Sequence, residues 1–232
     1  MSDERMLKHA VPEFASARED LKKLTMREAV VRFYARHDER IQDAIDASPQ
    51  KLGCEDGCSF CCRQFDVVVH PFEVFEIHAH VARHFKPDQL RGVIDRATRV
   101  VEARKKATEE ERLTLKPTCP FLINNSCSIY ASRPSACRNY HATDRDNCKQ
   151  SMEAPFSTWP TTYIDDVFCT AMGSSAGFKN AVDELGLDTR GYHLSSAFLE
   201  AMRSPDCAKR FKAGKRAFLK ATSSEFESST AS

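Results

Sequence analysis

The stretch Cys54-Glu55-Asp56-Gly57-Cys58-Ser59-Phe60-Cys61-Cys62 places four cysteines within nine residues. A second set of four follows after a longer interval, at Cys119, Cys127, Cys137 and Cys148. Thiolates this close together repel one another unless a cation holds them, or unless they oxidise. The main question that the sequence raises is therefore which of these two states the cysteines adopt.

Composition and charge narrow the class of protein. The chain has 232 residues, of which 41% are hydrophobic, and its net charge is +1. Residues 1–14 carry charges and lack the apolar segment of a secretory signal, so we expect a cytoplasmic protein. Because the cytoplasm keeps thiols reduced, ten cysteines favour metal binding over disulfides. No apolar run is long enough to span a membrane, and basic residues are spread among acidic ones, which argues against nucleic-acid binding.

Helical periodicity dominates the chain outside the cysteine blocks. Thr25 and Glu28 have the spacing of a capping box inside the first helical stretch, and Gly186 is placed to end a later helix. Proline at the first turn predicts a helix from Pro71 to about His84 and another after Ser204. The other helical patterns cover residues 18–47, 88–113, 163–185 and 194–202.

Strand signals are few. The β-branched run within residues 65–70 predicts a short strand. Asn124-Asn125-Ser126 is typical of a turn, so we expect a small hairpin that brings Cys119 and Cys127 together. The expected fold class is therefore mainly α, with a small β-hairpin and strand region around a cysteine-rich metal site.

The chain divides into four expected regions. Residues 1–15 have the character of a loose leader, and residues 141–161 that of a polar loop. The tail is rich in serine and is expected to be disordered. The regions are a leader and helix at 1–49, a cysteine-cluster metal-binding domain at 50–150, helices packed on it at 151–222, and the tail at 223–232.

The cysteine spacing bears on the kind of metal. Soft thiolates select zinc, copper(I) or iron–sulfur clusters. Structural zinc sites usually pair two short knuckles with two ligands each, whereas this chain has one dense knuckle and four spread cysteines. That asymmetry favours an iron–sulfur cluster or an unusual zinc site. Neighbouring side chains diverge, so either Cys61 and Cys62 do not both ligate one ion, or two metals are present.

Several motifs in a fixed order carry a family resemblance. They are Cys54-x3-Cys58-x2-Cys61-Cys62, Cys119-Pro120-Phe121-Leu122, Cys127-Ser128-Ile129-Tyr130 and Arg133-Pro134-x2-Cys137-Arg138-x-Tyr140. Over about residues 50–150 the chain resembles the CxxxCxxCC cysteine-cluster family, a zinc- or iron-chelating domain that also occurs in flagellin lysine N-methylases. The resemblance implies a metal site, with zinc, iron or a [4Fe–4S] cluster as the bound group.

Three functions remain open at this point. The first is metal binding through Cys54, Cys58, Cys61, Cys62, Cys119, Cys127, Cys137 and Cys148. The second is a cluster-dependent enzyme, such as a protein methyltransferase or an oxidoreductase. The third is a structural metal module that supports binding to a protein partner. The first block also fits the three-cysteine signature of radical S-adenosylmethionine enzymes, but no apolar strand precedes Cys54 as that fold requires.

Two arginines flank Cys137 and have two readings. Arg133 and Arg138 can offset the negative charge of thiolates or hold an anionic cofactor in bidentate fashion. They can equally pack against the short helix predicted around Cys137 and cap it. The sequence alone does not choose between these roles.

Overall fold

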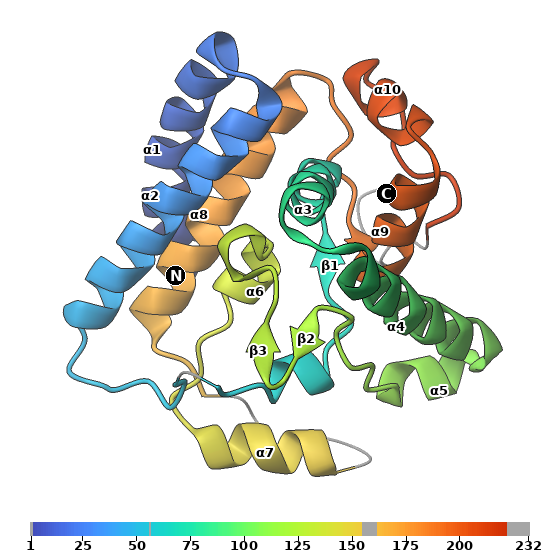
Figure 1. Ribbon diagram of the computed structural model, residues 1–232. Coiled ribbons are helices and arrows are strands. Elements are labelled where there is room, and N and C mark those ends of the chain that lie inside the picture. Colours follow the sequence, from blue (N-terminus) through green and yellow to red (C-terminus); the bar gives the residue numbers. More distant parts are fainter. Residues whose placement is uncertain (1, 56, 155–161, 222–232) are drawn as a thin grey trace.

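Helices form two groups, and the segments that carry the cysteine blocks lie below and between them (Figure 1). The structure is a computed structural model and describes residues 2–55, 57–154 and 162–221. Its sheets are both small, with two strands each. The expectation of a mainly α fold with little sheet is therefore confirmed.

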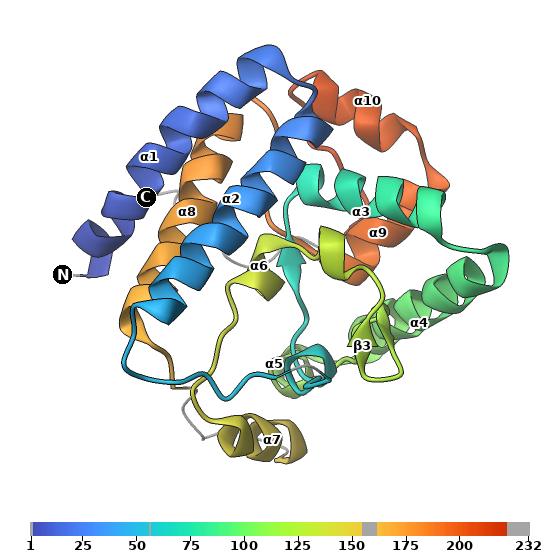
Figure 2. The same ribbon diagram turned by 60° about the vertical axis from the view of Figure 1, so that its left-hand side comes forward.

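The first group contains α1 (Ser2–Lys23), α2 (Met26–Asp46) and α8 (Asp165–Glu184), which lie side by side in Figures 1 and 2. The capping box expected at Thr25 is present: its hydroxyl accepts from the Glu28 amide at 3.3 Å, and the Glu28 carboxylate accepts from the Thr25 amide at 2.9 Å. Phe33 of α2 stacks on Phe178 of α8 at 4.3 Å between ring centroids. These contacts fix α2 against α8.

Helix α1 corrects the expectation of a loose leader at residues 1–15. Its buried face includes Ala10 and Ala17, and α8 has glycines at the contact, so that a Cβ at Gly177 would come within 2.4 Å of the Ala10 carbonyl oxygen. The same face carries Glu13, which is fully buried and accepts from Arg36 Nη2 at 2.7 Å. An apolar pattern search misses such a face, because neither small residues nor a buried acid register as a hydrophobic stripe.

The second group contains five helices. They are α3 (Pro71–His84), α4 (Pro87–Lys106), α5 (Glu109–Thr114), α9 (Leu194–Arg203) and α10 (Asp206–Lys212). The single helix expected over 88–113 is broken, because Ala107 has extended backbone and Thr108 caps a new helix through the Glu111 amide at 3.2 Å. The helix expected after Ser204 ends early, near Gly214 with its φ of +67°.

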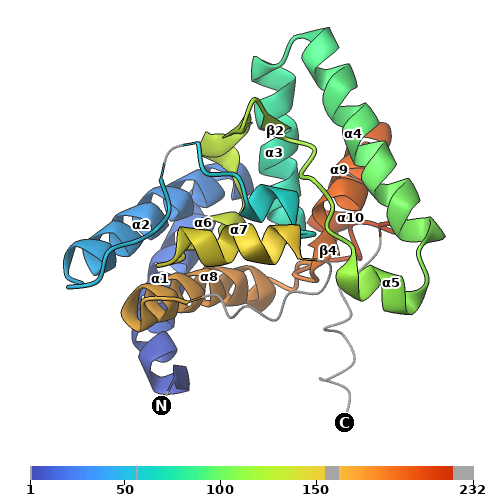
Figure 3. The same ribbon diagram turned by 90° about the horizontal axis from the view of Figure 1, so that it is seen from below.

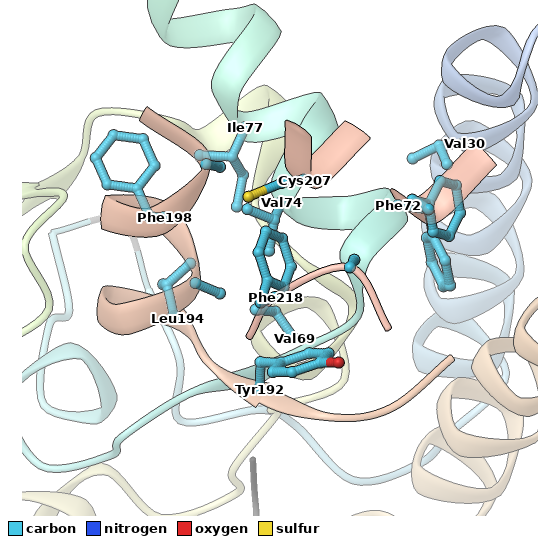
Figure 4. Close-up of a cluster of buried hydrophobic side chains, with 14 of the residues drawn as sticks. Val30, Val69, Phe72, Val74, Ile77, Tyr192, Leu194, Phe198, Cys207 and Phe218 are labelled. Carbon is cyan, nitrogen blue, oxygen red and sulfur yellow. The ribbon is translucent and has the colours of Figure 1, made fainter. Parts of the chain in front are cut away.

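The main core lies around α3, and Figure 4 shows part of it. Val74 and Ile77 of α3 are fully buried there, together with Tyr192 and Phe218 from the C-terminal part of the chain. Phe72 of α3 meets Phe178 edge-on at 5.4 Å and so joins the core to the first helix group. The first half of helix α3 is therefore held firmly in the core.

The two sheets are short antiparallel pairs. The strand expected within 65–70 is reduced to β1 (Val68–Val69), which pairs with β4 (Tyr192–His193), a partner that the sequence did not indicate. The expected hairpin is present as β2 (Leu122–Ile123) and β3 (Ser126–Cys127).

Short helical segments fill the rest of the cysteine region. They are η1 (Cys61–Arg63), η2 (Tyr130–Ser132), α6 (Ser135–Arg138) and α7 (Arg145–Glu153). Helix α7 corrects the expectation of a loop over 141–161, and Figure 3 shows it crossing the lower side of the molecule. The serine-rich tail from residue 223 lies outside the described residues.

Candidate metal centre

The first cysteine block is a tight loop held against the second. The Gly53 amide donates to the Ala142 carbonyl at 2.8 Å. A Cβ at Gly53 would lie 2.8 Å from the Arg145 amide nitrogen, so only glycine fits this approach. Gly57 has a φ of +81°, which permits the turn between Cys54 and Cys58.

The chain leaves the first block at η1 and returns to it after α3, α4 and α5. The return is direct, because the Cys119 amide donates to the Cys62 carbonyl oxygen at 2.7 Å. Two cysteine blocks that are far apart in sequence are thus joined through the backbone of their own cysteines.

The β2–β3 hairpin carries Cys127 and is attached to the first cysteine block. Asn124 and Asn125 have φ values of 49° and 60°, the left-handed geometry that a two-residue turn of this kind needs and that asparagine tolerates. The Asn125 side-chain oxygen accepts from Arg63 Nη2 at 2.5 Å and from the Ser59 hydroxyl at 3.5 Å. Asn125 therefore ties the hairpin tip to the first cysteine block.

Helix α7 brings in Cys148. The Gln64 amide group donates to the Cys148 carbonyl at 3.3 Å and accepts from the Ser151 hydroxyl at 2.9 Å. The Tyr140 hydroxyl lies 4.0 Å from Cys148 Sγ. The Lys116 ammonium caps the C-terminal end of the helix: it donates to the Met152 carbonyl at 3.4 Å and to the carbonyls of Ser151 and Ala154. Cys148 thus lies beside η1, at the edge of the same site.

Cys61 influences the pKa of most other cysteines in the two blocks. A hydrogen bond to Cys62 and burial raise the pKa of Cys61 well above its usual range. Burial is also the main cause that raises the pKa of the surrounding thiols, and for Cys119 the result is about 12. Negative charge on Cys61 adds to the rise in pKa at Cys54, Cys119, Cys127, Cys137 and Cys148.

The two arginines of the expected anion site have different surroundings. Arg138 is buried: Nε donates to the Arg133 carbonyl at 2.9 Å, Nη2 to the Ala131 carbonyl at 2.7 Å, and Nη1 to Asp38. This geometry favours packing over anion binding for Arg138. Arg133 stacks on Tyr130 at 4.2 Å, and its positive charge opposes the burial that raises the pKa of Cys54, Cys127 and Cys137.

The donor set suits a soft metal. All ten cysteines are free, and charge on Cys61 contributes to the raised pKa of five other cysteines in the two blocks. Among the described residues, no three His, Cys, Asp or Glu side chains are already drawn together closely enough to hold an ion. Buried thiols that oppose one another's ionisation become thiolates most readily when a cation replaces their protons, which is the condition for zinc or iron ligation.

Reasoning from the sequence missed the residues that support the cysteines. Gln64, Asn125 and Lys116 are ordinary polar residues in sequence, and their contacts span more than thirty positions each. Glu73 does have a local signal, because it follows Pro71 at the capping position of α3. That signal predicts a helix cap and does not reveal the longer-range contacts of the same carboxylate.

Comparison with known proteins agrees with this chemistry. Residues 53–159 match the family CxxCxxCC, described as "Putative zinc- or iron-chelating domain". No curated protein and no solved structure matches the chain. Over the described part of the chain, no helix has the length and apolar character needed to cross a membrane. The matched residues, 53–159, contain both cysteine blocks, so the similarity to this family lies in the region that carries the candidate metal ligands.

Proposed function

We propose that this protein binds zinc or iron through the thiolates of its two cysteine blocks. The single observation that carries the proposal is the direct backbone contact between the blocks, with the Cys119 amide bonded to the Cys62 carbonyl. The ligands would come from Cys54, Cys58, Cys61, Cys62, Cys119, Cys127, Cys137 and Cys148. Free thiols in this number suit a reducing compartment, and we place the protein in the cytoplasm.

An iron–sulfur centre is the preferred form of this site. The candidate ligands are asymmetric, with one dense knuckle and four spread cysteines, whereas structural zinc sites usually pair two short knuckles with two ligands each. A single iron–sulfur cluster also takes four cysteines, so the eight of the two blocks could supply two metal centres. When bound, a cluster supplies redox or Lewis-acid chemistry, whereas a closed zinc site supplies rigidity.

A structural metal module is the second candidate, and one observation favours it. Five of the eight cysteines come from η1, the hairpin, α6 and α7, which are each too short to be stable alone, and the other three lie outside helices and strands. A metal bound by all of them would hold this part of the fold together and present it to a protein partner.

Anaerobic purification tests the proposal. We expect the wild-type protein to retain zinc or iron by elemental analysis, and a visible absorption spectrum would distinguish an iron–sulfur cluster from colourless zinc. Cys61→Ala should remove most of the metal, because Cys61 is central to the set. Cys169→Ala is the matched control, since Cys169 is a buried cysteine of α8 in a different part of the fold.

Two results would count against the proposal. Wild-type protein without bound metal, and with all its thiols reactive, would remove the metal-binding function. Equal metal content in Cys61→Ala and in Cys169→Ala would show that the retained metal lies elsewhere.

A further inference from the structure

Glu73 is a buried carboxylate in the first turn of α3, and its exposed fraction is 1%. One of its oxygens accepts from the His70 amide at 3.0 Å, which is the ordinary capping contact of its own helix. The other oxygen accepts from both the amide and the hydroxyl of Ser135, each at 2.7 Å. It also lies 3.3 Å from the Tyr34 hydroxyl of α2. One side chain therefore joins three separate segments.

Ser135 is the first residue of α6, and Cys137 lies two residues further on. Helix α6 has four residues, and an isolated helical turn of that length is not stable in water. Its position must come from contacts with the rest of the protein, and the Glu73 carboxylate satisfies its first amide. The carboxylate is fixed in turn, because the residues that follow it on α3, Val74 and Ile77, are fully buried in the core.

We propose that Glu73 is a positioning residue for the metal centre: it holds α6 so that the Cys137 thiol faces the other cysteines. The inference rests on the proposed metal-binding function and adds a residue outside the family-matched cysteines that controls one of them. It differs from a helix cap, because the bonds from Ser135 link the core helix α3 directly to the turn that carries Cys137.

A carboxylate is the side chain that this position requires. Glu73 accepts from two backbone amides and two hydroxyls, which an ionised carboxylate can do because both oxygens are acceptors. Glutamine has one acceptor oxygen and one donor group. Glu73→Gln would therefore set its amino group against an amide of α3 or of α6, and one buried donor would lose its partner.

Reactivity of individual cysteines in the protein purified with its own metal tests the proposal. The protein is treated with iodoacetamide under anaerobic conditions, and the modification of each cysteine is followed by peptide mass spectrometry. In the wild type, we expect ligation to protect Cys137. In Glu73→Gln, Cys137 should react about 10-fold faster or more, and metal affinity should fall about 10–100-fold, the range typical for residues that support metal ligands.

Glu13→Gln is the matched control. Glu13 is also a fully buried glutamate, and its partners, Arg36 and Arg40, belong to α2 rather than to the cysteine region. Its replacement should lower stability without increasing the reactivity of Cys137. Ser135→Ala removes one of the two bonds to Glu73 and should raise Cys137 reactivity by a smaller factor, so it decides the question if Glu73→Gln does not fold. In the double variant the two effects should not add, because they act through one contact.

The outcomes separate this inference from the function on which it rests. If the wild type retains no metal and its cysteines all react, the proposed function fails and the inference falls with it. If the wild type retains metal and protects Cys137, but Glu73→Gln and Ser135→Ala protect it equally well, only the positioning role is overturned. Equal effects of Glu13→Gln and Glu73→Gln on Cys137 would also overturn it, since general loss of stability would explain both.

Discussion

His37 is a buried histidine of α2 that makes stability depend on pH. Its exposed fraction is 0%, and Nε2 lies 2.8 Å from the side-chain oxygen of Asn139. Burial lowers the pKa of His37 to about 4. In the unfolded chain the pKa returns to about 6.5, so between these values the unfolded state binds the proton and the folded state does not. The contribution of His37 to the free energy of unfolding is therefore fully present above about pH 6.5 and is lost as the pH falls towards about 4.

Replacing His37 tests this pH dependence. On going from about pH 7 to about pH 4.5, the wild type should lose about 2–3 kcal/mol more free energy of unfolding than His37→Gln, because glutamine keeps the donor to Asn139 and does not titrate. Denaturant unfolding of both proteins in the same metal state measures the difference. Parallel pH profiles would show that His37 is protonated in the folded protein at acid pH.

At the scale of residues, the sequence singles out the cysteines as candidate ligands and gives no comparable signal for the residues that support them. Close spacing alone predicts that Cys58 and Cys61 are metal ligands, because few other roles need thiols at such intervals. Glu73 and Asn125 have no such mark, since their importance comes from partners 62 residues away in sequence. Arg138 is the opposite case. Its charge beside a cysteine suggests an anion ligand in the sequence, whereas in the structure its guanidinium donates to backbone carbonyls of the same turn.

The close contact between α1 and α8 depends on two glycines of α8. A Cβ at Gly177 would lie 2.4 Å from the Ala10 carbonyl oxygen, and one at Gly173 would lie 2.2 Å from that of Met6. Alanine has a higher helix propensity than glycine by about 1 kcal/mol. The clash costs more than this gain, because α1 must move away along its whole contact with α8. We expect Gly177→Ala to lower the free energy of unfolding by about 1–3 kcal/mol.

Gly92 of α4 provides the matched control for that prediction. Its added Cβ would meet only the end of the Arg96 side chain, at 3.3 Å, and that end can move. Gly92→Ala should therefore raise the free energy of unfolding by up to about 1 kcal/mol. Denaturant unfolding followed by circular dichroism compares the two variants. Stabilisation by alanine at both positions would mean that α1 and α8 are less closely packed than the structure has them.

At the scale of elements, prediction from sequence succeeded for the hairpin and for helices with a conventional apolar face, and it failed for α1 and α7, which lack one. Helix α3 has proline at its start and a run of buried apolar residues, and its predicted bounds agree with the structure. Helix α7 has two buried residues, Cys148 and Ser151, and neither is a large apolar residue. Its position depends on Gln64 and Lys116 instead. Such elements are specified by tertiary contacts, which a periodicity search does not register.

At the scale of the whole molecule, the fold divides into parts with and without a hydrophobic core of their own. The helices around α3 and α8 share buried aromatic residues such as Phe33, Phe72 and Phe178. The cysteine region consists of residues 50–62 and 117–148. Among its described residues, the large apolar ones that are fully buried are Phe121 and Ile129. Ordering a residue costs roughly 1–2 kcal/mol of backbone entropy, so this region depends on additional bonds.

Metal removal should therefore loosen the cysteine region and leave the helical groups folded. Structural zinc contributes on the order of 10 kcal/mol of binding free energy at neutral pH, enough to order several short segments at once. After chelation under reducing conditions, we expect amide hydrogen exchange to accelerate over residues 50–62 and 117–148, while α3 and α8 keep their protection and most of the helical circular dichroism remains. Cys58→Ser should move the protein part of the way towards the same state.

If residues 117–148 are equally protected with and without metal, then contacts such as those of Glu73 and Asn125 order the region by themselves. In that case the metal would enter a preformed pocket, an arrangement suited to catalysis or to reversible binding of the ion rather than to structural support.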